Sequence, residues 1–255
     1  MQFDETRCEV AVGTRMLTDF GLAAGVRASL GHVSVRVPGD PGKFVVKGRG
    51  YRLDTLARMR PEDLVVCDLE ANLVEGPPEI VPCFEVKIHS CIYKARPDVQ
   101  SVVHVHPKYA VIMSVVGKAI RSMCNEGNQL VMDPLPVYPK QKIITTDAEG
   151  TEVARLLGSG RALLLFGHGA VTAGASMERS VTDMIHLEHQ AEMNYIACVM
   201  AGMDHPYVTR AQLEEFMGGP SHFELPHFQQ AIAKAGRPRY SGVWRAWYEE
   251  AAGAL

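Results

Sequence analysis

The stretch VQSVVHVHP, residues 99–107, holds two histidines two positions apart in a run rich in valine. Valine favours strands, and successive side chains of a strand point to opposite faces. His104 and His106 are therefore expected on one face, with Val103 and Val105 on the other. Imidazole is the commonest metal-binding side chain, so this spacing indicates one ion shared by both rings. The alternative is a half-exposed edge strand with two solvated histidines.

Segments on either side of this stretch supply further candidate ligands. Residues 84–95 carry apolar side chains at helical spacing, and a turn at 96–98 ends the predicted helix. Because the chain then reverses into the strand, Glu85 is expected near the two histidines. Downstream, the apolar strand at 161–166 is followed by His168 between two glycines. Three histidines and a carboxylate form a set that suits zinc and leaves room for a substrate.

Composition sets the broad class. The chain has 255 residues, with 47% hydrophobic and 22% charged residues and a net charge of −3. These values are ordinary for a globular protein and indicate neither a nucleic acid nor an anionic membrane as a partner. We find no apolar run long enough for a transmembrane helix and no signal region at the N-terminus. The six cysteines form no CxxC pair and predict reduced thiols in a cytoplasmic protein.

The remaining patterns predict strands interspersed among helices. Helices are expected at residues 5–24, 108–116, 147–157 and 177–200, the last after an N-cap serine at 176. Strands are expected at 31–37 and 43–48 around a turn at 38–42, followed by a short strand pair within 60–76 that bends at 70–72. This order predicts an α/β protein built on one central sheet, whose strand order periodicity does not determine.

Several of these motifs together resemble the class II aldolase/adducin family. The pattern includes Glu85, His89, Tyr93, Arg96-Pro97-Asp98, His104-Val105-His106 and Gly167-His168-Gly169, together with GHVSVR at 31–36, RPEDLVV at 60–66 and the helix at 176–197. The resemblance covers roughly residues 8–200 in the family's order.

This resemblance implies a fold and an assembly. It implies a single domain at residues 1–200 with a central, mainly antiparallel sheet between helical layers. Residues 201–255 are then a C-terminal extension packing on the same domain. Its aromatic end, with Trp244, Trp247 and Tyr248, either packs as a helix or closes over an aromatic substrate. The resemblance also implies a homotetramer with active sites at subunit boundaries.

The resemblance further implies roles for the clustered residues. His104, His106 and His168 are the expected ligands of one divalent ion per chain, Zn²⁺ or Mn²⁺. Glu85 stands at the position of the family's catalytic acid/base, and burial is expected to keep it protonated. A supporting role beside a ligand is the alternative for Glu85. His32 is expected to share the proton transfer.

The chain departs from the sugar-phosphate aldolases where those enzymes bind phosphate. The serine pair before the catalytic glutamate is here Cys83-Phe84, and His32 replaces an amide. The loop at 46–50, Val-Lys-Gly-Arg-Gly, brings two cations, Lys47 and Arg49. These changes favour a flat acid carrying carboxylates, with Lys47 and Arg49 on its second carboxylate and Ser34 and Phe84 lining the site. An ordinary charged hairpin loop is the alternative for the two cations.

These departures resemble a decarboxylase branch of the family, which acts on hydroxylated aromatic or pyridine dicarboxylates such as dihydroxyphthalate or 3-hydroxy-2-methylpyridine-4,5-dicarboxylate. The predicted function is a metal-dependent decarboxylase whose enolate or carbanion intermediate is protonated by an acid residue. The alternative is a class II aldolase or epimerase acting on a sugar-derived substrate, including a non-phosphorylated one. An adducin-like binding module is less favoured because it needs no such cluster, and a metal-dependent oxygenase is a further option.

Overall fold

A central sheet organises the computed structural model, which describes residues 3–50, 54–219, 221–236 and 242–253. Its strands are β1 (Gly31–Val37), β2 (Asp40–Arg49), β3 (Leu64–Asp68), β4 (Leu73–Glu75), β5 (Val81–Pro82), β6 (Ser101–Val105), β7 (Val137–Tyr138), β8 (Ala162–Leu165) and β9 (Gly169–Gly174). They run in the order β4-β3-β2-β1-β6-β9-β8-β7, with β5 paired to β2. Among the described strands β7 and β8 make the parallel pair and the other pairs are antiparallel, which confirms the predicted sheet.

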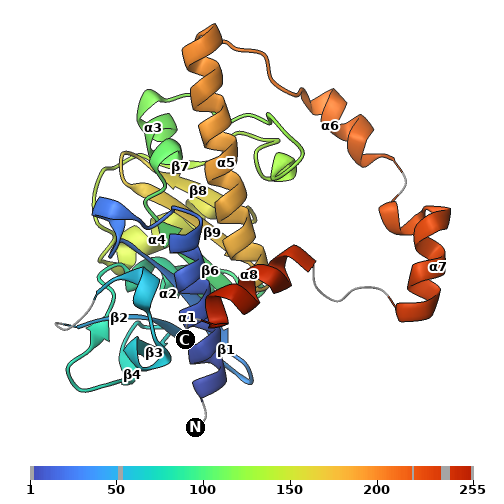
Figure 1. Cartoon of the computed structure of the whole chain (residues 1–255). Helices are drawn as coiled ribbons and strands as arrows, with labels where there is room; N and C mark the ends of the chain where they lie inside the picture. The colour runs from blue at the N-terminus through green and yellow to red at the C-terminus, as the bar shows by residue number, and fades with distance from the viewer. Residues whose placement is uncertain (1–2, 51–53, 220, 237–241, 254–255) are drawn as a thin grey trace.

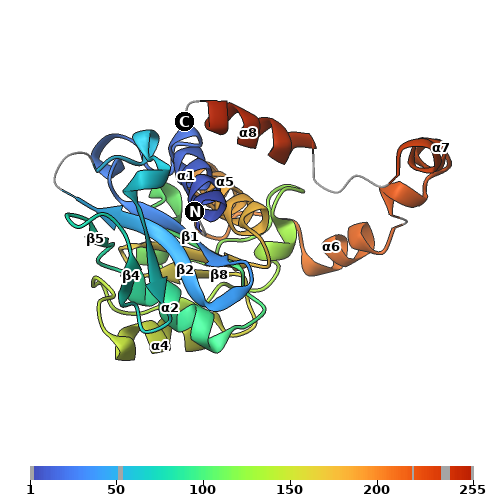
Figure 2. The ribbon, with the colours of Figure 1, turned by 90° about the horizontal axis from the view of Figure 1, so that it is seen from below.

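Helices cover both faces of this sheet (Figures 1 and 2). The hydrophobic core on one face includes residues of α1 (Asp4–Asp19), α3 (Lys108–Val116), α5 (Met177–Ala201) and α8 (Gly242–Gly253). The core on the other face includes residues of α2 (Val86–Ala95) and α4 (Asp147–Leu157). Val103 and Val105 belong to the first core and Val102 to the second. Because strand side chains alternate, His104 lies on the α2 face.

Most predicted elements form with the expected bounds, and the differences have local causes. The first helix ends at Asp19, because Gly21 adopts a left-handed φ of +71° and the chain turns away. The turn after β1 is tighter than expected, since β2 already begins at Asp40. Residues 169–174, for which no element was predicted, form the strand β9.

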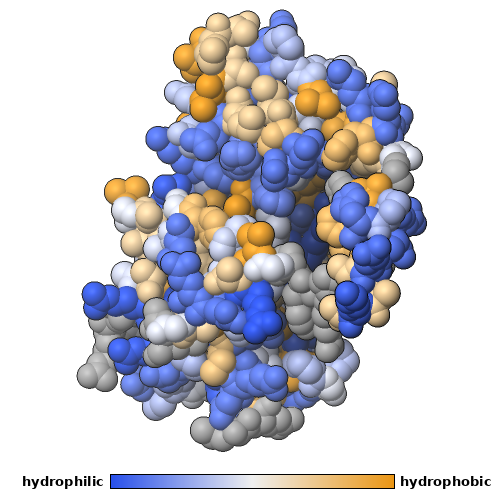
Figure 3. All heavy atoms as spheres, turned by 45° about the vertical axis from the view of Figure 1, so that its right-hand side comes forward, coloured by the Kyte–Doolittle hydropathy of each residue, from blue (hydrophilic) through white to orange (hydrophobic). Residues whose placement is uncertain are grey.

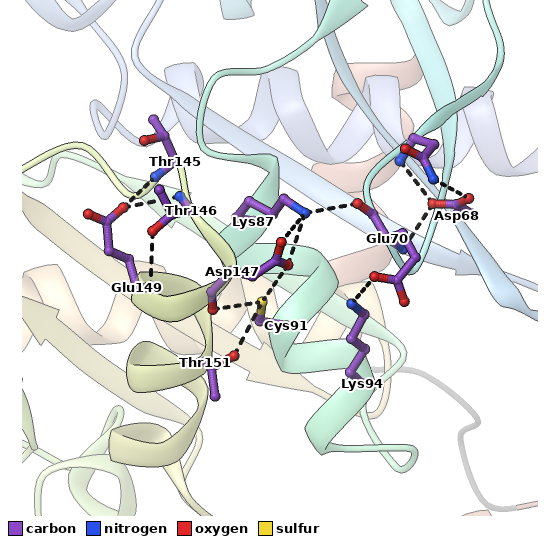
Figure 4. A network of polar contacts seen from close by, with 11 residues as sticks. Asp68, Glu70, Lys87, Cys91, Lys94, Thr145, Thr146, Asp147, Glu149 and Thr151 are labelled. Carbon is purple, nitrogen blue, oxygen red and sulfur yellow. Dashed lines mark hydrogen bonds and ion pairs between the residues drawn. The ribbon is translucent and has the colours of Figure 1, made fainter.

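Helix α2, which begins just after Glu85, is tied to its neighbours by charged contacts (Figure 4). The Lys87 ammonium donates to both carboxylate oxygens of Asp147, at 2.9 and 3.0 Å, and to the Glu70 carbonyl oxygen at 2.9 Å. Lys94 donates to the Glu70 carboxylate at 2.6 Å. The helix is thereby fixed to α4 and to the turn between β3 and β4.

The C-terminal extension packs on the domain only in part. Helices α6 (Arg210–Met217) and α7 (Pro226–Ala235) form an arm in both ribbon views (Figures 1 and 2), whose first helix buries Leu213 and pairs Arg210 with Asp133 of the domain. Helix α8 returns to α1, where the ring of Trp247 meets that of Phe20 edge-on at 4.5 Å. Tyr240 and Ser241, at the start of the predicted aromatic end, lie outside the described residues. No helix in the described ranges is both long and apolar enough to cross a bilayer.

Candidate metal centre

Four side chains from three segments of the chain meet at one point of the α2 face. His104 lies on β6, His106 follows its end, His168 lies in the turn between β8 and β9, and Glu85 stands at the N-cap position of α2. Each offers one ligand atom, and these atoms lie within 4.8 Å of one another. The structure therefore brings together all three predicted ligands and the predicted carboxylate.

The environment of His104 fits a bound cation. Its side chain is fully buried, and Nδ1 lies 3.0 Å from the carbonyl oxygen of Ala170. Because a carbonyl oxygen only accepts, Nδ1 carries the proton in the neutral ring and Nε2 keeps its lone pair. Nε2 has no hydrogen-bond partner among the described residues and lies 3.2 Å from Oε2 of Glu85. Two acceptors that face each other in a buried site are stabilised by a cation between them.

The other two rings complete the donor set. The rings of His106 and His168 are 4.6 Å apart and nearly perpendicular, at 88°. His168 places Nε2 at 3.4 Å from Oε2 of Glu85. Burial, followed by the neighbouring His104 and His168, lowers the pKa of His106 to about 3. The ring is therefore neutral at pH 7, which is the form that binds a metal ion.

The charge of Glu85 differs from the sequence-based expectation. Burial alone would raise its pKa, but contacts with His104 and His168 lower the pKa further than burial raises it, to well below the usual range. The N–H of Ile144 also donates to Oε1 at 2.9 Å. The lowered pKa favours the carboxylate form of Glu85, contrary to the expectation that burial keeps it protonated.

Close packing of two strands aligns the histidines. A Cβ atom at Gly169 would lie 2.4 Å from the carbonyl oxygen of Val105 and 3.0 Å from Cε1 of His104. Only a glycine therefore fits between the ligand-bearing strand and the turn that carries His168. This requirement explains the second glycine of the Gly-His-Gly motif.

The predicted proton-transfer residue His32 lies next to this cluster. It pairs with His104 across β1 and β6, and the two rings are 5.1 Å apart. Ser34, predicted to contact substrate, is fully buried on the same strand face, with its hydroxyl bonded to His89 and Tyr93. The prediction that Ser34 contacts substrate is therefore wrong, because its side chain lies inside the protein.

The two predicted cations both pair with Asp54. Lys47 is 2% exposed, contacts the Asp54 carboxylate, and donates to the carbonyl oxygen of Ser29 at 2.8 Å. Arg49 contacts the same carboxylate at 2.9 Å and is partly exposed. Its guanidinium lies over the ring of Phe84, which is 60% exposed, at 4.4 Å. Lys47 thus supports the loop, whereas Arg49 and Phe84 form a surface that a ligand can reach.

A second group of possible ligands lies alongside, formed by His32, Cys83 and His89. It does not suit a metal ion, because Nδ1 of His32 and Nε2 of His89 are only 2.6 Å apart, which is a hydrogen-bond distance. Burial also raises the pKa of the Cys83 thiol, so the thiolate that a metal requires is disfavoured.

Sequence reasoning missed Arg27. It lies in a short 3₁₀ helix at Gly25–Arg27 and donates to the backbone carbonyl oxygen of His106 at 3.3 Å. Its guanidinium also donates to the carbonyl oxygen of Gly21 at 3.3 Å. A cation in a glycine-flanked loop just before the GHVSVR segment was the available signal.

Comparisons with known proteins identify this arrangement. The fold and the candidate site of three histidines and one glutamate define a protein of the class II aldolase type. The family model described as the class II aldolase and adducin N-terminal domain matches residues 8–195. The chain therefore belongs to the class II aldolase and adducin family.

Three curated relatives carry the name 3,4-dihydroxyphthalate decarboxylase. The chain is 30% identical to the one from Arthrobacter keyseri over 192 residues, which cover 72% of this chain and 75% of the relative. It is 28% identical to the one from a Terrabacter species over 236 residues, which cover 89% and 95%. These relatives confirm the resemblance to the decarboxylase branch. The solved L-fuculose 1-phosphate aldolase from Glaciozyma antarctica, 20% identical with a TM-score of 0.74 over 98% of this chain and 90% of that one, confirms the fold.

Proposed function

We propose that this protein is a metal-dependent decarboxylase of a hydroxylated aromatic dicarboxylate. The observation that carries the proposal is the cluster of three histidines, one buried and two partly buried, beside the carboxylate of Glu85. Its support comes from relatives named as 3,4-dihydroxyphthalate decarboxylases and from the altered pocket at Cys83-Phe84.

His104, His106 and His168 would hold one Zn²⁺ or Mn²⁺ per chain, because imidazoles and a carboxylate accept either ion. When bound, the ion supplies a Lewis acid that stabilises negative charge on a substrate oxygen. The carbonyl of Ala170 and the backbone around Gly169 orient the ligand rings before any ion arrives.

Glu85 is proposed as the proton-transfer residue. Decarboxylation breaks the bond between a ring carbon and its carboxylate, CO₂ leaves, and the electron pair stays on the ring, which then takes one proton. Because Glu85 starts as a carboxylate, it has to receive a proton before it can give one. The ring hydroxyl of the substrate can supply that proton, and Glu85 can return it to the carbon.

Arg49 and Phe84 are proposed to bind the substrate. The ring of Phe84 is exposed and offers an apolar surface to a flat substrate, while Arg49 above it can donate to a carboxylate. Lys47 contributes by holding Asp54 and the loop in place. The phosphate of a sugar phosphate would find here a neutral buried thiol and a phenyl ring, neither of which donates strong hydrogen bonds.

A homotetramer is proposed as the working assembly. The chain's own α8 packs on the α1 face, opposite the face that carries His104, so it does not cover its own centre. Apolar side chains are exposed near the top of the molecule, where α5 ends (Figure 3), and along the arm. They are Ile196, Val199, Met200, Phe216, Met217 and Phe228. Burying these side chains against another subunit would remove them from water.

The decisive experiment combines metal analysis with a substrate panel. Purified protein loaded with Zn²⁺ or Mn²⁺ is incubated with 3,4-dihydroxyphthalate, with other hydroxylated aromatic dicarboxylates, and with L-fuculose 1-phosphate. We expect CO₂ release from an aromatic acid, one bound ion per chain, and loss of both in His104→Ala. Cleavage of the sugar phosphate without any CO₂ release from the acids would overturn the proposal.

A further inference from the structure

A chain of four buried side chains leads from the interior of the protein to the edge of the metal centre. Oγ of Ser34 lies 2.7 Å from the Tyr93 hydroxyl and 2.6 Å from Nδ1 of His89. On the far side of the same ring, Nε2 of His89 lies 2.6 Å from Nδ1 of His32. All four side chains are at most 5% exposed.

Two elements build this chain. His32 and Ser34 are two residues apart on β1 and share one strand face, while His89 and Tyr93 are four residues apart on α2 and share one helix face. The ring of Phe44 lies nearly parallel to that of His89, at 15°, with centroids 6.4 Å apart. The rings therefore have fixed orientations, and only the positions of the protons remain to be assigned.

The Tyr93 hydroxyl decides the direction of the chain. The oxygens that can accept its proton are Oγ of Ser34 at 2.7 Å and the carbonyl oxygen of Gln100 at 3.5 Å. Hydrogen bonds between oxygens are normally 2.5–3.0 Å long, so Gln100 is a poor acceptor. A buried hydroxyl proton without an acceptor costs about 1–3 kcal/mol. Tyr93 therefore donates to Ser34.

The remaining protons follow one by one. Ser34 accepts from Tyr93, and its single proton goes to Nδ1 of His89. Burial lowers the pKa of His89 to about 3, so its neutral ring carries one proton, which is then on Nε2. That proton is donated to Nδ1 of His32. Because Nδ1 of His32 accepts this proton, the neutral ring of His32 carries its own proton on Nε2.

We infer that Tyr93, Ser34 and His89 are positioning residues that hold His32 as a neutral donor with its proton on Nε2. The ring of His32 is 5% exposed, and its Nε2 atom makes no hydrogen bond among the described residues. The ring lies beside His104, where it offers an N–H to an oxygen of a bound ligand. This assignment rests on the proposed function: the oxygen is then the substrate oxygen on which negative charge develops during decarboxylation. His32 is then a donor and Glu85 the proton carrier.

The test reads the proton positions directly, without relying on turnover. Nitrogen-15 NMR of histidine-labelled, Zn²⁺-loaded protein distinguishes a protonated from an unprotonated ring nitrogen, and His32→Gln and His89→Gln assign the signals. We expect protons on Nε2 of both His32 and His89. Tyr93→Phe removes the hydroxyl that donates to Ser34. Ser34 is then free to donate in either direction, so the rings of His89 and His32 should both become mixtures of tautomers. Ser34→Ala should do the same by a second route.

Tyr138→Phe is the matched control, because Tyr138 is also fully buried and its hydroxyl has no partner among the described residues. It should leave both histidine spectra unchanged. If the protein is active, kcat in Tyr93→Phe should fall by the same factor as the Nε2-protonated fraction of His32, with KM unchanged. A wild-type His32 protonated on Nδ1, or a Tyr93→Phe spectrum identical to wild type, would overturn the inference. The expected spectra in a protein without decarboxylase activity would leave the inference standing and remove only the proposed function.

Discussion

The carboxylate form of Glu85 determines which chemistry this residue can perform. A carboxylate in contact with two imidazoles can attract a cation or accept a proton, whereas an amide in its place can do neither. Glu85→Gln keeps the shape of the side chain and its acceptor for the N–H of Ile144. Chemistry that needs proton transfer should therefore suffer more than folding does.

We expect Glu85→Gln to lower kcat by about 10²–10⁴-fold, the usual contribution of a general acid or base. The three histidines should still bind metal, and the melting temperature should change little. Metal analysis and steady-state kinetics on the same preparation check this. Near wild-type turnover would exclude Glu85 as the proton carrier.

A substitution at Arg49 tests whether this residue binds the second carboxylate of the substrate. Its guanidinium is shared between Asp54 and the surface of Phe84, so its removal leaves a substrate carboxylate only partly compensated. We expect Arg49→Ala to lower kcat/KM for a dicarboxylate about tenfold or more, equivalent to at least about 1.4 kcal/mol. A monocarboxylate analogue should be affected less. Arg60→Ala, at an exposed arginine, is the control, and an equal loss for both acids would assign Arg49 to loop support.

The buried His89 predicts how stability depends on pH. Its pKa is lowered to about 3 by burial, whereas an unfolded chain protonates a histidine near pH 6.5. Between these values the unfolded state binds the extra proton, so the contribution of His89 to stability is present above about pH 6.5 and is lost as pH falls toward 3. Urea unfolding of the metal-free protein measures this.

His89→Gln removes that titration. The slope of unfolding free energy against pH should become shallower by up to about 1.4 kcal/mol per pH unit between pH 6 and 4. His205→Gln, at a histidine with its ring bonded to a neighbouring backbone carbonyl, serves as the comparison. An unchanged slope in His89→Gln would show that His89 is already protonated in the folded protein.

At the scale of the element, the position of β9 beside β6 decides whether the histidines converge. The two strands pair antiparallel from Ser101 with Gly174 to Val105 with Ala170, and Gly169 continues the approach at the centre itself. A methyl group there meets backbone as well as the His104 ring, so the strand ends have to separate.

We expect Gly169→Ala to weaken metal binding at least tenfold and to destabilise the protein by about 1–3 kcal/mol, the usual cost of overpacking. Gly42→Ala, in a strand glycine whose added methyl would meet only the Asp40 carboxylate at 3.5 Å, is the matched control. Metal titration and thermal unfolding report the two effects separately. Wild-type metal affinity in Gly169→Ala would contradict the role of this close approach.

At the scale of the whole molecule, the exposed end of α5 and the arm bear on the assembly. Met200 is 81% exposed near residues of the same apolar character, including Val199. If this surface is buried between subunits, Met200→Gln should shift a tetramer toward smaller species, because it places a polar amide in the contact. Met200→Leu keeps the apolar side chain and should assemble as wild type. Sedimentation velocity over a range of concentrations checks both, and an active wild-type monomer would refute the proposed tetramer.

Periodicity and motif spacing were sufficient to predict most elements of residues 1–200 and the residues of the candidate site. The bounds of α3 and α4 were predicted to the residue, because helix and strand periods and N-cap signals are local properties of the chain. His104, His106, His168 and Glu85 were all predicted from motif and order, and the structure gathers them.

Only the tertiary structure decided the charge states of the site residues, their ion-pair partners and the direction of their hydrogen bonds. Glu85 is ionised because two imidazoles from distant segments meet it, and Lys47 is unavailable to substrate because Asp54 and Ser29 occupy it. Ser34 was predicted to contact substrate, but His89 and Tyr93 of α2 occupy its hydroxyl instead. These properties depend on burial and on partners far apart in the chain, and neither is a periodic feature of the sequence.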